Sequence, residues 1–390
     1  MNFTIPNLDF ATVNAPKIYP SIIDKYEKIN RIIIIGNGFD LAHGLKSSFK
    51  DFIYYYSYKT IKTVLSDSKF DDPLISINTD ANFNNALKEI NRLTPKDAFH
   101  QIVSLSKKNH STVNFEWNSV FFNSIIKEIE NKNWVDIEIQ YFDYLKSKEI
   151  INSPESIKEL NIEFEYIKSS FLEYLNEEVS NNIFSTDDEL LSQFNQVIQP
   201  IDTRPNSVEE NKHPDKVCIL NFNYTDIAKK YALKLNSSKY IPIHGQLGGD
   251  NIGIQEPIFG FGDEIDQEYT KFELLRNDEI FKHIKSFKYL QFSHYRNLIE
   301  FLESNPFQVQ IFGHSCGLSD RTLLNSIFEH QNCISIKPFY FEKDGSNDYE
   351  QKSYSIARHF KSKSELRDKV VNKEYCQAMI QPVNSYGLNN

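Results

Sequence analysis

The sequence is poor in cysteine. Its 390 residues include four, at positions Cys218, Cys316, Cys333 and Cys376. None of them has the C-x-x-C spacing by which zinc ribbons hold a metal and thioredoxin-like proteins carry out redox chemistry. Widely spaced single cysteines are typical of proteins in a reducing cytosol. The sequence therefore predicts a cytoplasmic protein without a metal site.

Long apolar runs and excess positive charge are also missing. No stretch reaches the ~18 apolar residues that a membrane-spanning helix needs, and the first twenty residues lack the basic start and apolar run of a signal peptide. Lysine and arginine number 43 against 53 aspartates and glutamates, which gives a net charge of −10. A negative chain is not drawn generally to nucleic acid or to an anionic membrane, so neither is expected as a partner.

Four short apolar runs predict buried strands. Continuous apolar runs of this length are typical of parallel strands whose sheet is covered on both faces. The sequence therefore predicts an α/β protein with a Rossmann-like, doubly wound parallel sheet. The four runs are Arg31–Ile35, Val217–Leu220, Tyr240–Ile243 and Val309–Phe312.

The long stretch between the first two runs predicts an insertion. It is far longer than a crossover between parallel strands requires, and its apolar residues recur at helical spacing, as in Phe164, Ile167, Phe171 and Leu175. We therefore expect a discontinuous nucleotide-binding core, a helical insertion and a C-terminal segment. The predicted bounds are 1–50 with 210–345, then 51–209, then 346–390.

The first predicted strand ends in Gly36-Asn37-Gly38, followed by Asp40 and Gly44. Glycines let the backbone approach a phosphate, and the beginning of a helix supplies unpaired N–H groups and a partial positive charge. This motif therefore predicts a phosphate-binding loop. The alternative is that these glycines only make a tight turn between strand and helix.

Polar residues also follow the next two predicted strands. Asn221 and Asn223, with Tyr224, come after the second, and amides of this kind can hold a ribose hydroxyl or a water. Helix capping is the alternative for them. His244 and Gly245 come after the third. A histidine at a strand end is a candidate general base, because its pKa lies near the working pH.

The fourth predicted strand is followed by Gly313-His314-Ser315-Cys316-Gly317, which matches the G-x-S-x-G elbow of α/β hydrolases. Asp344 or Asp348, followed by His359, would complete the order of a hydrolase triad. Against this reading, Ser319 or Asp320 is a better N-cap than Ser315 for the helix that follows. We therefore assign Gly313, His314 and Ser315 to nucleotide binding and keep the Ser315 hydrolase as an alternative.

The order GNGFDLAHGL, NFNYT, IHG and GHSCGLSDRTLL resembles the AbiH family of phage-resistance proteins, and Trp134-Val135-Asp136-Ile137-Glu138 is similar to a second signature of that family. The alternatives for this segment are that Trp134 is a core residue and that Asp136 and Glu138 lie on a solvated helix face. The order is also similar to the SIR2-like NAD-binding pattern of three glycines, an asparagine and a histidine. Gly36, Gly38 and Gly44 stand at the glycine positions, Asn223 at the asparagine and His244 at the histidine. Asp40 and Thr225 depart from that pattern, which has serine and aspartate there, and the sirtuin zinc cysteines are missing.

The resemblance implies an antiphage NADase that stops the growth of infected cells. NAD would be its substrate, Asn223 and His244 its catalytic residues, and the motif residues named above would bind the nucleotide. A phage-encoded activator and a homo-oligomer are expected partners. A nucleotide-binding sensor or scaffold without catalysis is the main alternative.

Overall fold

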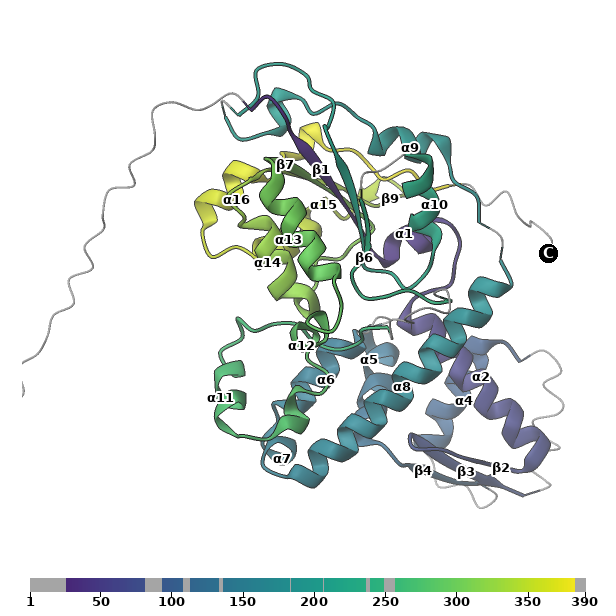
Figure 1. Cartoon of the computed structure of the whole chain (residues 1–390). Coiled ribbons are helices and arrows are strands. Elements are labelled where there is room, and N and C mark those ends of the chain that lie inside the picture. Colours follow the sequence, from purple (N-terminus) through teal and green to yellow (C-terminus); the bar gives the residue numbers. More distant parts are fainter. Residues whose placement is uncertain are drawn as a thin grey trace, which may run out of the picture.

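The computed structural model describes residues 26–80, 93–107, 113–132, 136–182, 184–205, 207–235, 239–248 and 257–382. These residues form two tiers (Figure 1). The upper tier is built around a parallel sheet, and the lower tier combines helices with a small antiparallel sheet.

Five parallel strands make the central sheet, in the order β6-β5-β1-β7-β8. All four predicted strands are confirmed, and with them the Rossmann-like α/β fold class. The fifth strand, β8, was missed because Ser335 and Lys337 interrupt its apolar run. Lys337 is nevertheless buried, since its Nζ lies 2.9 Å and 3.0 Å from the two carboxylate oxygens of Asp202. The strands are β1 (Asn30–Ile35), β5 (Val217–Asn221), β6 (Lys239–Pro242), β7 (Phe307–Phe312) and β8 (Cys333–Phe339).

Helices cover both faces of this sheet, which explains the continuous apolar runs. Ile32 and Ile34 of β1 face one helical layer, and Ile33 and Ile35 face the other. The first layer holds α13 (His294–Ser304), α14 (Arg321–Phe328), α15 (Tyr349–Ala357) and α16 (Lys363–Lys369). The second holds α1 (Asn37–Ala42), α9 (Asp188–Phe194) and α10 (Ile227–Lys234). Shorter elements near them are η1 (Pro200–Asp202), η3 (Leu318–Asp320), β9 (Glu342–Lys343), β10 (Ser346–Asn347) and η4 (Lys373–Tyr375).

The lower tier contains the predicted helices but is not all helical. Three antiparallel strands, in the order β2-β3-β4, lie beside its helices (Figure 1). A second chain segment, Phe259–Ile284, joins the same apolar core. The elements are α2 (Phe49–Asp67), β2 (Lys69–Asp71), β3 (Ile75–Thr79), α4 (Pro95–Lys107), β4 (Val113–Trp117), α5 (Val120–Lys132), α6 (Ile137–Leu145), α7 (Lys148–Ile151), α8 (Pro154–Ser180), α11 (Tyr269–Leu274), η2 (Asp278–Phe281) and α12 (Lys285–Tyr289).

The strand order reverses direction at β1. From β1 the chain adds β5 and β6 on one side, then crosses to add β7 and β8 on the other. In open α/β sheets, ligands bind beyond the carboxyl ends of the strands at such a reversal. The turn from β1 into α1 and the loop that follows β7 meet at this point, where Gly38 N–H, in the first turn of α1, donates to the Gly313 carbonyl at 2.8 Å.

Glycines allow these two loops to touch. A Cβ added at Gly36 would lie 2.5 Å from His314 Cα, and one at Gly38 would lie 2.8 Å from the Gly313 oxygen. Gly313 itself has a φ of +66°, and its added Cβ would lie 2.1 Å from Phe39 N. Contact between the two loops therefore requires glycine at all three positions, whatever the loops bind. A Gly38→Val change would disturb the fold as well as any ligand site.

We expect Gly313→Ala to lower the free energy of unfolding by about 3 kcal/mol, because it adds a backbone clash to the strain of a positive φ. Gly345→Ala is the matched control, since Gly345 has a similar φ of +76° but no atom within 4 Å of an added Cβ. It should cost about 1 kcal/mol. Chemical denaturation measures both variants, and equal losses would contradict the packing argument.

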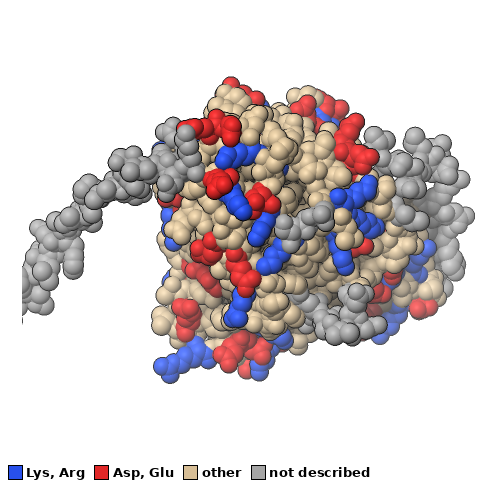
Figure 2. All heavy atoms as spheres, turned by 45° about the horizontal axis from the view of Figure 1, so that its top comes forward, with Lys and Arg blue, Asp and Glu red and all other residues tan. Residues whose placement is uncertain are grey.

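Two properties of the described residues concern membranes and surface charge. Within the described ranges, no helix combines the length and apolar character needed to cross a membrane. On the face seen in Figure 2, lysine and arginine side chains lie among aspartate and glutamate side chains. That face therefore presents no large area of one charge sign.

Candidate functional site

A cavity of about 460 Å³ lies beyond the carboxyl ends of the strands, between the two tiers. Ten of the residues predicted to form the site line it, although they come from distant parts of the sequence. These are Gly36, Asn37, Gly38, Asp40, Asn223, Tyr224, His244, Gly313, His314 and Ser315. The lower tier contributes further wall residues, including Lys50, Asp136, Glu138 and Phe171.

Three predicted residues are not part of the cavity wall. Gly44 and Gly245 have φ values of +82° and +81° and allow turns in the loops that follow α1 and β6. Asn221 is fully buried, and its Nδ2 donates to the Asn223 carbonyl at 3.0 Å. In this structure the three residues shape the loops and have no face on the cavity.

The backbone N–H groups at the beginning of α1 are largely in use. Gly38 N–H donates to the Gly313 carbonyl at 2.8 Å, and Phe39 N–H donates to the Gly36 carbonyl at 2.9 Å. The sequence interpretation expected these groups to be unpaired and directed at a phosphate. That expectation is wrong for Gly38 and Phe39, because the loop that follows β7 approaches closely enough to accept one of the bonds.

Asp40 is a buried residue of the cavity wall. Its carboxyl group accepts hydrogen bonds from Asn223 and Thr225 of the NFNYT motif. Asn223 Nδ2 donates to Asp40 Oδ1 at 2.8 Å, and Thr225 Oγ1 donates to Asp40 Oδ2 at 2.7 Å. Burial raises the pKa of Asp40 to about 7, although the two donated hydrogen bonds oppose the shift. Asn223 also donates to the Gly36 carbonyl at 3.0 Å. Because both its acceptors are oxygens, the amide orientation is determined, and among the described residues Asn223 Oδ1 has no hydrogen-bond partner.

We expect Asp40→Asn to remove part of the pH dependence of stability. A carboxyl whose pKa is raised on folding favours the folded state fully at low pH, and this contribution is lost as the pH rises through about 7. Between pH 5 and pH 8 the native protein should lose about 2 kcal/mol more stability than the variant. Urea denaturation at both pH values measures this difference. Parallel losses in the two proteins would show that Asp40 does not titrate in this range.

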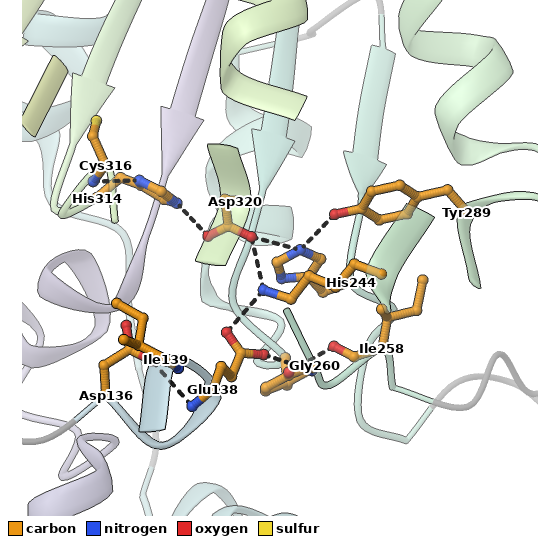
Figure 3. Close-up of polar contacts among 12 residues, drawn as sticks. Asp136, Glu138, Ile139, His244, Ile258, Gly260, Tyr289, His314, Cys316 and Asp320 are labelled. Atoms are coloured by element: carbon orange, nitrogen blue, oxygen red, sulfur yellow. Dashed lines mark hydrogen bonds and ion pairs between the residues drawn. The ribbon is translucent and has the colours of Figure 1, made fainter. Parts of the chain in front are cut away.

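The candidate base His244 is held by Asp320 (Figure 3). His244 Nε2 lies 3.3 Å from Asp320 Oδ1 and 3.1 Å from the Tyr289 hydroxyl. Burial alone would raise the pKa of Asp320, but Lys285 and His244 hold it well below its usual value, so Asp320 is ionised and accepts. Nε2 therefore carries the proton of the neutral ring. Nδ1, which has no partner in the described part of the chain, keeps its lone pair.

The second histidine, His314, has no such lone pair to offer. Its Nδ1 accepts the Cys316 N–H at 2.9 Å, so Nε2 carries the proton and lies 3.6 Å from Asp320 Oδ2. The two histidines thus approach the two oxygens of one carboxylate, and the ring of Phe222 contacts both, with centroids 5.2 Å and 4.3 Å away. His244 is therefore the better candidate base, and His314 helps to orient Asp320.

Lys285 lies behind this pair and links the two tiers. Its Nζ donates to Asp320 Oδ1 and to Glu138 Oε2, both at 2.8 Å, and its side chain is 1% exposed. Glu138 also accepts the Gly260 N–H at 2.9 Å. Burial raises the pKa of Glu138 to about 7 despite the neighbouring ammonium group. Lys285 therefore stabilises two buried carboxyl groups that come from different tiers.

For the second signature, the alternative that Asp136 and Glu138 lie on a solvated helix face is wrong. Glu138 is buried, and Asp136 is half-buried as the N-cap of α6, where its Oδ1 accepts the N–H groups of Glu138 and Ile139 at 3.1 Å. Trp134 lies outside the described residues. Lys285 and Tyr289 were missed, because nothing in the local pattern of α12 separates a buried lysine from an exposed one.

The residues of the hydrolase triad do not meet. His359 Nε2 bonds to the Cys316 carbonyl at 2.9 Å and makes no contact with Ser315. Asp348 accepts the Phe341 N–H, and Asp344 occupies the exposed turn between β9 and β10. Positive φ values occur at Gly313 and Cys316 on either side of Ser315, and α14 begins only at Arg321. The Ser315 hydrolase therefore has no triad in this structure.

The cavity thus combines a neutral histidine with a free lone pair, a fixed asparagine carbonyl and several carboxyl groups. Such a set can activate a water molecule and stabilise positive charge that develops on a ligand. A family model described as bacteriophage abortive infection AbiH matches residues 32–342, a range that contains every residue of the cavity wall. A search of curated proteins gives no match. Because the family match spans most of the sequence, this chain belongs to the bacteriophage abortive infection AbiH family.

Proposed function

We propose that this protein defends cells against bacteriophage by hydrolysing NAD at the bond between nicotinamide and ribose, on a SIR2-like core. The family description supports the defence role. The observation that carries the chemistry is the Asp320–His244 pair, in which Asp320 accepts from Nε2–H of a histidine of the cavity wall, so that the Nδ1 lone pair is available as a base.

The proposed reaction needs one base and little acid catalysis. His244 Nδ1 takes a proton from water while the water oxygen bonds to the anomeric carbon of the ribose and the bond to nicotinamide breaks. Nicotinamide leaves as a neutral molecule, so no proton has to be delivered to it. The products are nicotinamide, ADP-ribose and a proton, which His244 releases to solvent. Asn223 Oδ1 would orient either the water or a ribose hydroxyl.

The two departures from the SIR2-like pattern support a common core, because they contact each other. The pattern has serine near the first loop and aspartate after the second strand. This chain has Asp40 and Thr225 at those positions, and their side chains form a hydrogen bond of 2.7 Å. Relative to the pattern, the hydroxyl and the carboxylate have therefore exchanged positions. Asp40 and Thr225 still bring one carboxylate and one hydroxyl into contact, as the serine and aspartate of the pattern would.

We assign the pyrophosphate to other residues than the glycine loop that the sequence predicted. Since Gly38 and Phe39 use their N–H groups internally, the loop offers fewer donors than expected. Lys50 is the lysine of the cavity wall, to which Ser47 also belongs. We assign the phosphates to this end of the cavity, where Lys50 compensates their charge.

The direct test is to incubate the pure protein with NAD and to measure nicotinamide and ADP-ribose by chromatography, with and without phage lysate. Release of both products in equal amounts supports the proposal. The lysate arm is needed because a toxic NADase must be held inactive until infection. Binding of NAD in calorimetry without product in either arm would instead favour a nucleotide-binding sensor.

A further inference from the structure

A second cavity, of about 220 Å³, lies where residues of α8, the Pro257–Phe259 segment and α12 come together. Among the described residues, none lines both this cavity and the one that contains His244, which we call the first cavity. The second cavity has less than half the 460 Å³ of the first, but far more room than the ~30 Å³ that one water molecule occupies. Its size therefore suits an organic ligand smaller than a dinucleotide.

The charges of the second cavity are the reverse of those of the first. The wall of the first cavity has four carboxyl groups and one lysine. The second has one carboxyl group, Glu165, and three lysines, Lys168, Lys282 and Lys288. Glu165 Oε1 lies 2.9 Å from Lys168 Nζ, so these two charges offset each other. Neither Lys282 nor Lys288 has an ion-pair partner within the described ranges, and their two positive charges remain to attract an anion.

His283, a buried residue of the same wall, is close enough to all three lysines to be affected by their charge. Burial and the three ammonium groups together lower the pKa of His283 to about 3, so its ring is neutral. Its Nε2 is buried and has no hydrogen-bond partner in the part of the chain that the structure describes. A buried polar atom of this kind is rare in proteins, and a ligand at the wall can supply the partner.

Backbone hydrogen bonds fix the two segments that carry most of this wall. Phe261 N–H donates to the His283 carbonyl at 3.0 Å, and Lys285 N–H donates to the Phe261 carbonyl at 2.9 Å. Ile258, which lines the second cavity, donates its N–H to the carbonyl of His244 at 2.8 Å. The cavity is therefore largely formed before a ligand enters, which lowers the entropic cost of binding.

Apolar side chains complete the wall of the second cavity, so the wall combines positive charge with surface for an organic group. Lysine binds phosphate as a point charge, and a phosphate monoester carries about −1.5 to −2 charges at pH 7. Such a dianion matches the two lysines that have no carboxylate partner. The apolar residues are Pro257, Ile258, Phe259 and Phe292.

We propose that the second cavity is a binding site for a small organic anion that carries a phosphate monoester group. Lys282 and Lys288 compensate the charge of the phosphate, and the apolar side chains contact the organic part of the ligand. The site is separate from the end of the first cavity near Lys50, to which the phosphates of NAD are assigned. The inference therefore goes beyond the proposed function and does not depend on NAD hydrolysis.

The test compares phenyl phosphate with benzoate, which has the same ring but only one negative charge, by calorimetry on the full chain. We expect phenyl phosphate to bind roughly tenfold more tightly, because its second charge meets the second lysine. Added salt should weaken this binding, since Lys282 is exposed and Lys288 is only partly buried. Inorganic phosphate should bind more weakly than phenyl phosphate, because it has no apolar group to pack against the wall.

A variant with both Lys282→Met and Lys288→Met removes the two charges and should bind phenyl phosphate about tenfold more weakly or not at all. Neither lysine is fully buried, so this variant should melt close to the parental temperature. Lys229→Met is the matched control for the loss of charge. Lys229 is an exposed lysine of α10 that belongs to neither cavity wall, and its variant should keep the parental affinity.

Lys50→Met distinguishes the two cavities, because it removes the lysine of the first and leaves the second intact. Binding of phenyl phosphate that persists in Lys50→Met and is lost in the double lysine variant supports the inference. Loss of all binding in Lys50→Met would place the anion in the first cavity and overturn it. Equal affinity for phenyl phosphate and benzoate, no binding at millimolar concentration, or full affinity in the double variant would also overturn it.

Discussion

His244→Ala should reduce NAD cleavage by about 10²–10⁴-fold, because it removes the base that the Asp320 pair orients. NAD binding should persist, since the variant leaves Lys50 and Asn223 in place. Burial lowers the pKa of His244, so the base is neutral at pH 7 and the native rate should fall only at pH values below the usual histidine range. Nicotinamide release and calorimetry measure the two properties separately. His213→Ala, at an exposed histidine, is the control and should keep the parental rate.

Asn223 should act as a unit with His244. Asn223→Ala alone should be nearly inactive, and the double variant should be little worse than either single one, because base and orienting amide serve the same step. The structure places both side chains on one cavity, as this expectation requires. Additive losses in the double variant, or a His244→Ala protein that still consumes NAD at the parental rate, would refute the mechanism.

Lys285→Met should lower the free energy of unfolding by about 3–5 kcal/mol, the usual cost of leaving buried charges without their partner. The variant leaves Glu138 and Asp320 facing each other without the ammonium group that lies 2.8 Å from both. The loss should be smaller at low pH, where the carboxyl groups can take up protons. Lys282→Met, at an exposed lysine three residues earlier, is the matched control and should change stability little.

A further Glu138→Gln change tests the cause of this loss. Removing one of the two carboxylates should restore part of the stability in the Lys285→Met background, although Glu138→Gln alone should destabilise the native protein. Denaturation of the four proteins gives the coupling energy. A Lys285→Met protein as stable as Lys282→Met, or a double variant less stable than both singles, would show that charge pairing does not hold the two tiers together here.

The sequence by itself determined the sheet and one edge of the site. Ile32 to Ile35 form a continuous apolar run because both faces of β1 are covered, and the same rule located β5, β6 and β7. Since the strands are parallel, their carboxyl ends lie at one edge, and this brought Gly36, Asn223 and His244 to one cavity. These properties follow from local pattern and from a general rule of α/β sheets.

The tertiary structure alone decided what surrounds those residues. Lys285, Glu138 and Asp320 meet from three segments that are far apart in the sequence, and a buried ion pair has no local pattern because burial depends on the other tier. For the same reason β8 was missed, since its Lys337 is buried only where Asp202 reaches it. The sequence pattern explained Gly36 and Gly38 by the approach of a bound phosphate. In the structure, the space that a Cβ would need at these positions is occupied by the loop that follows β7. Contacts between distant segments determine which charges are paired and which donors remain, and neither propensity nor spacing contains that information.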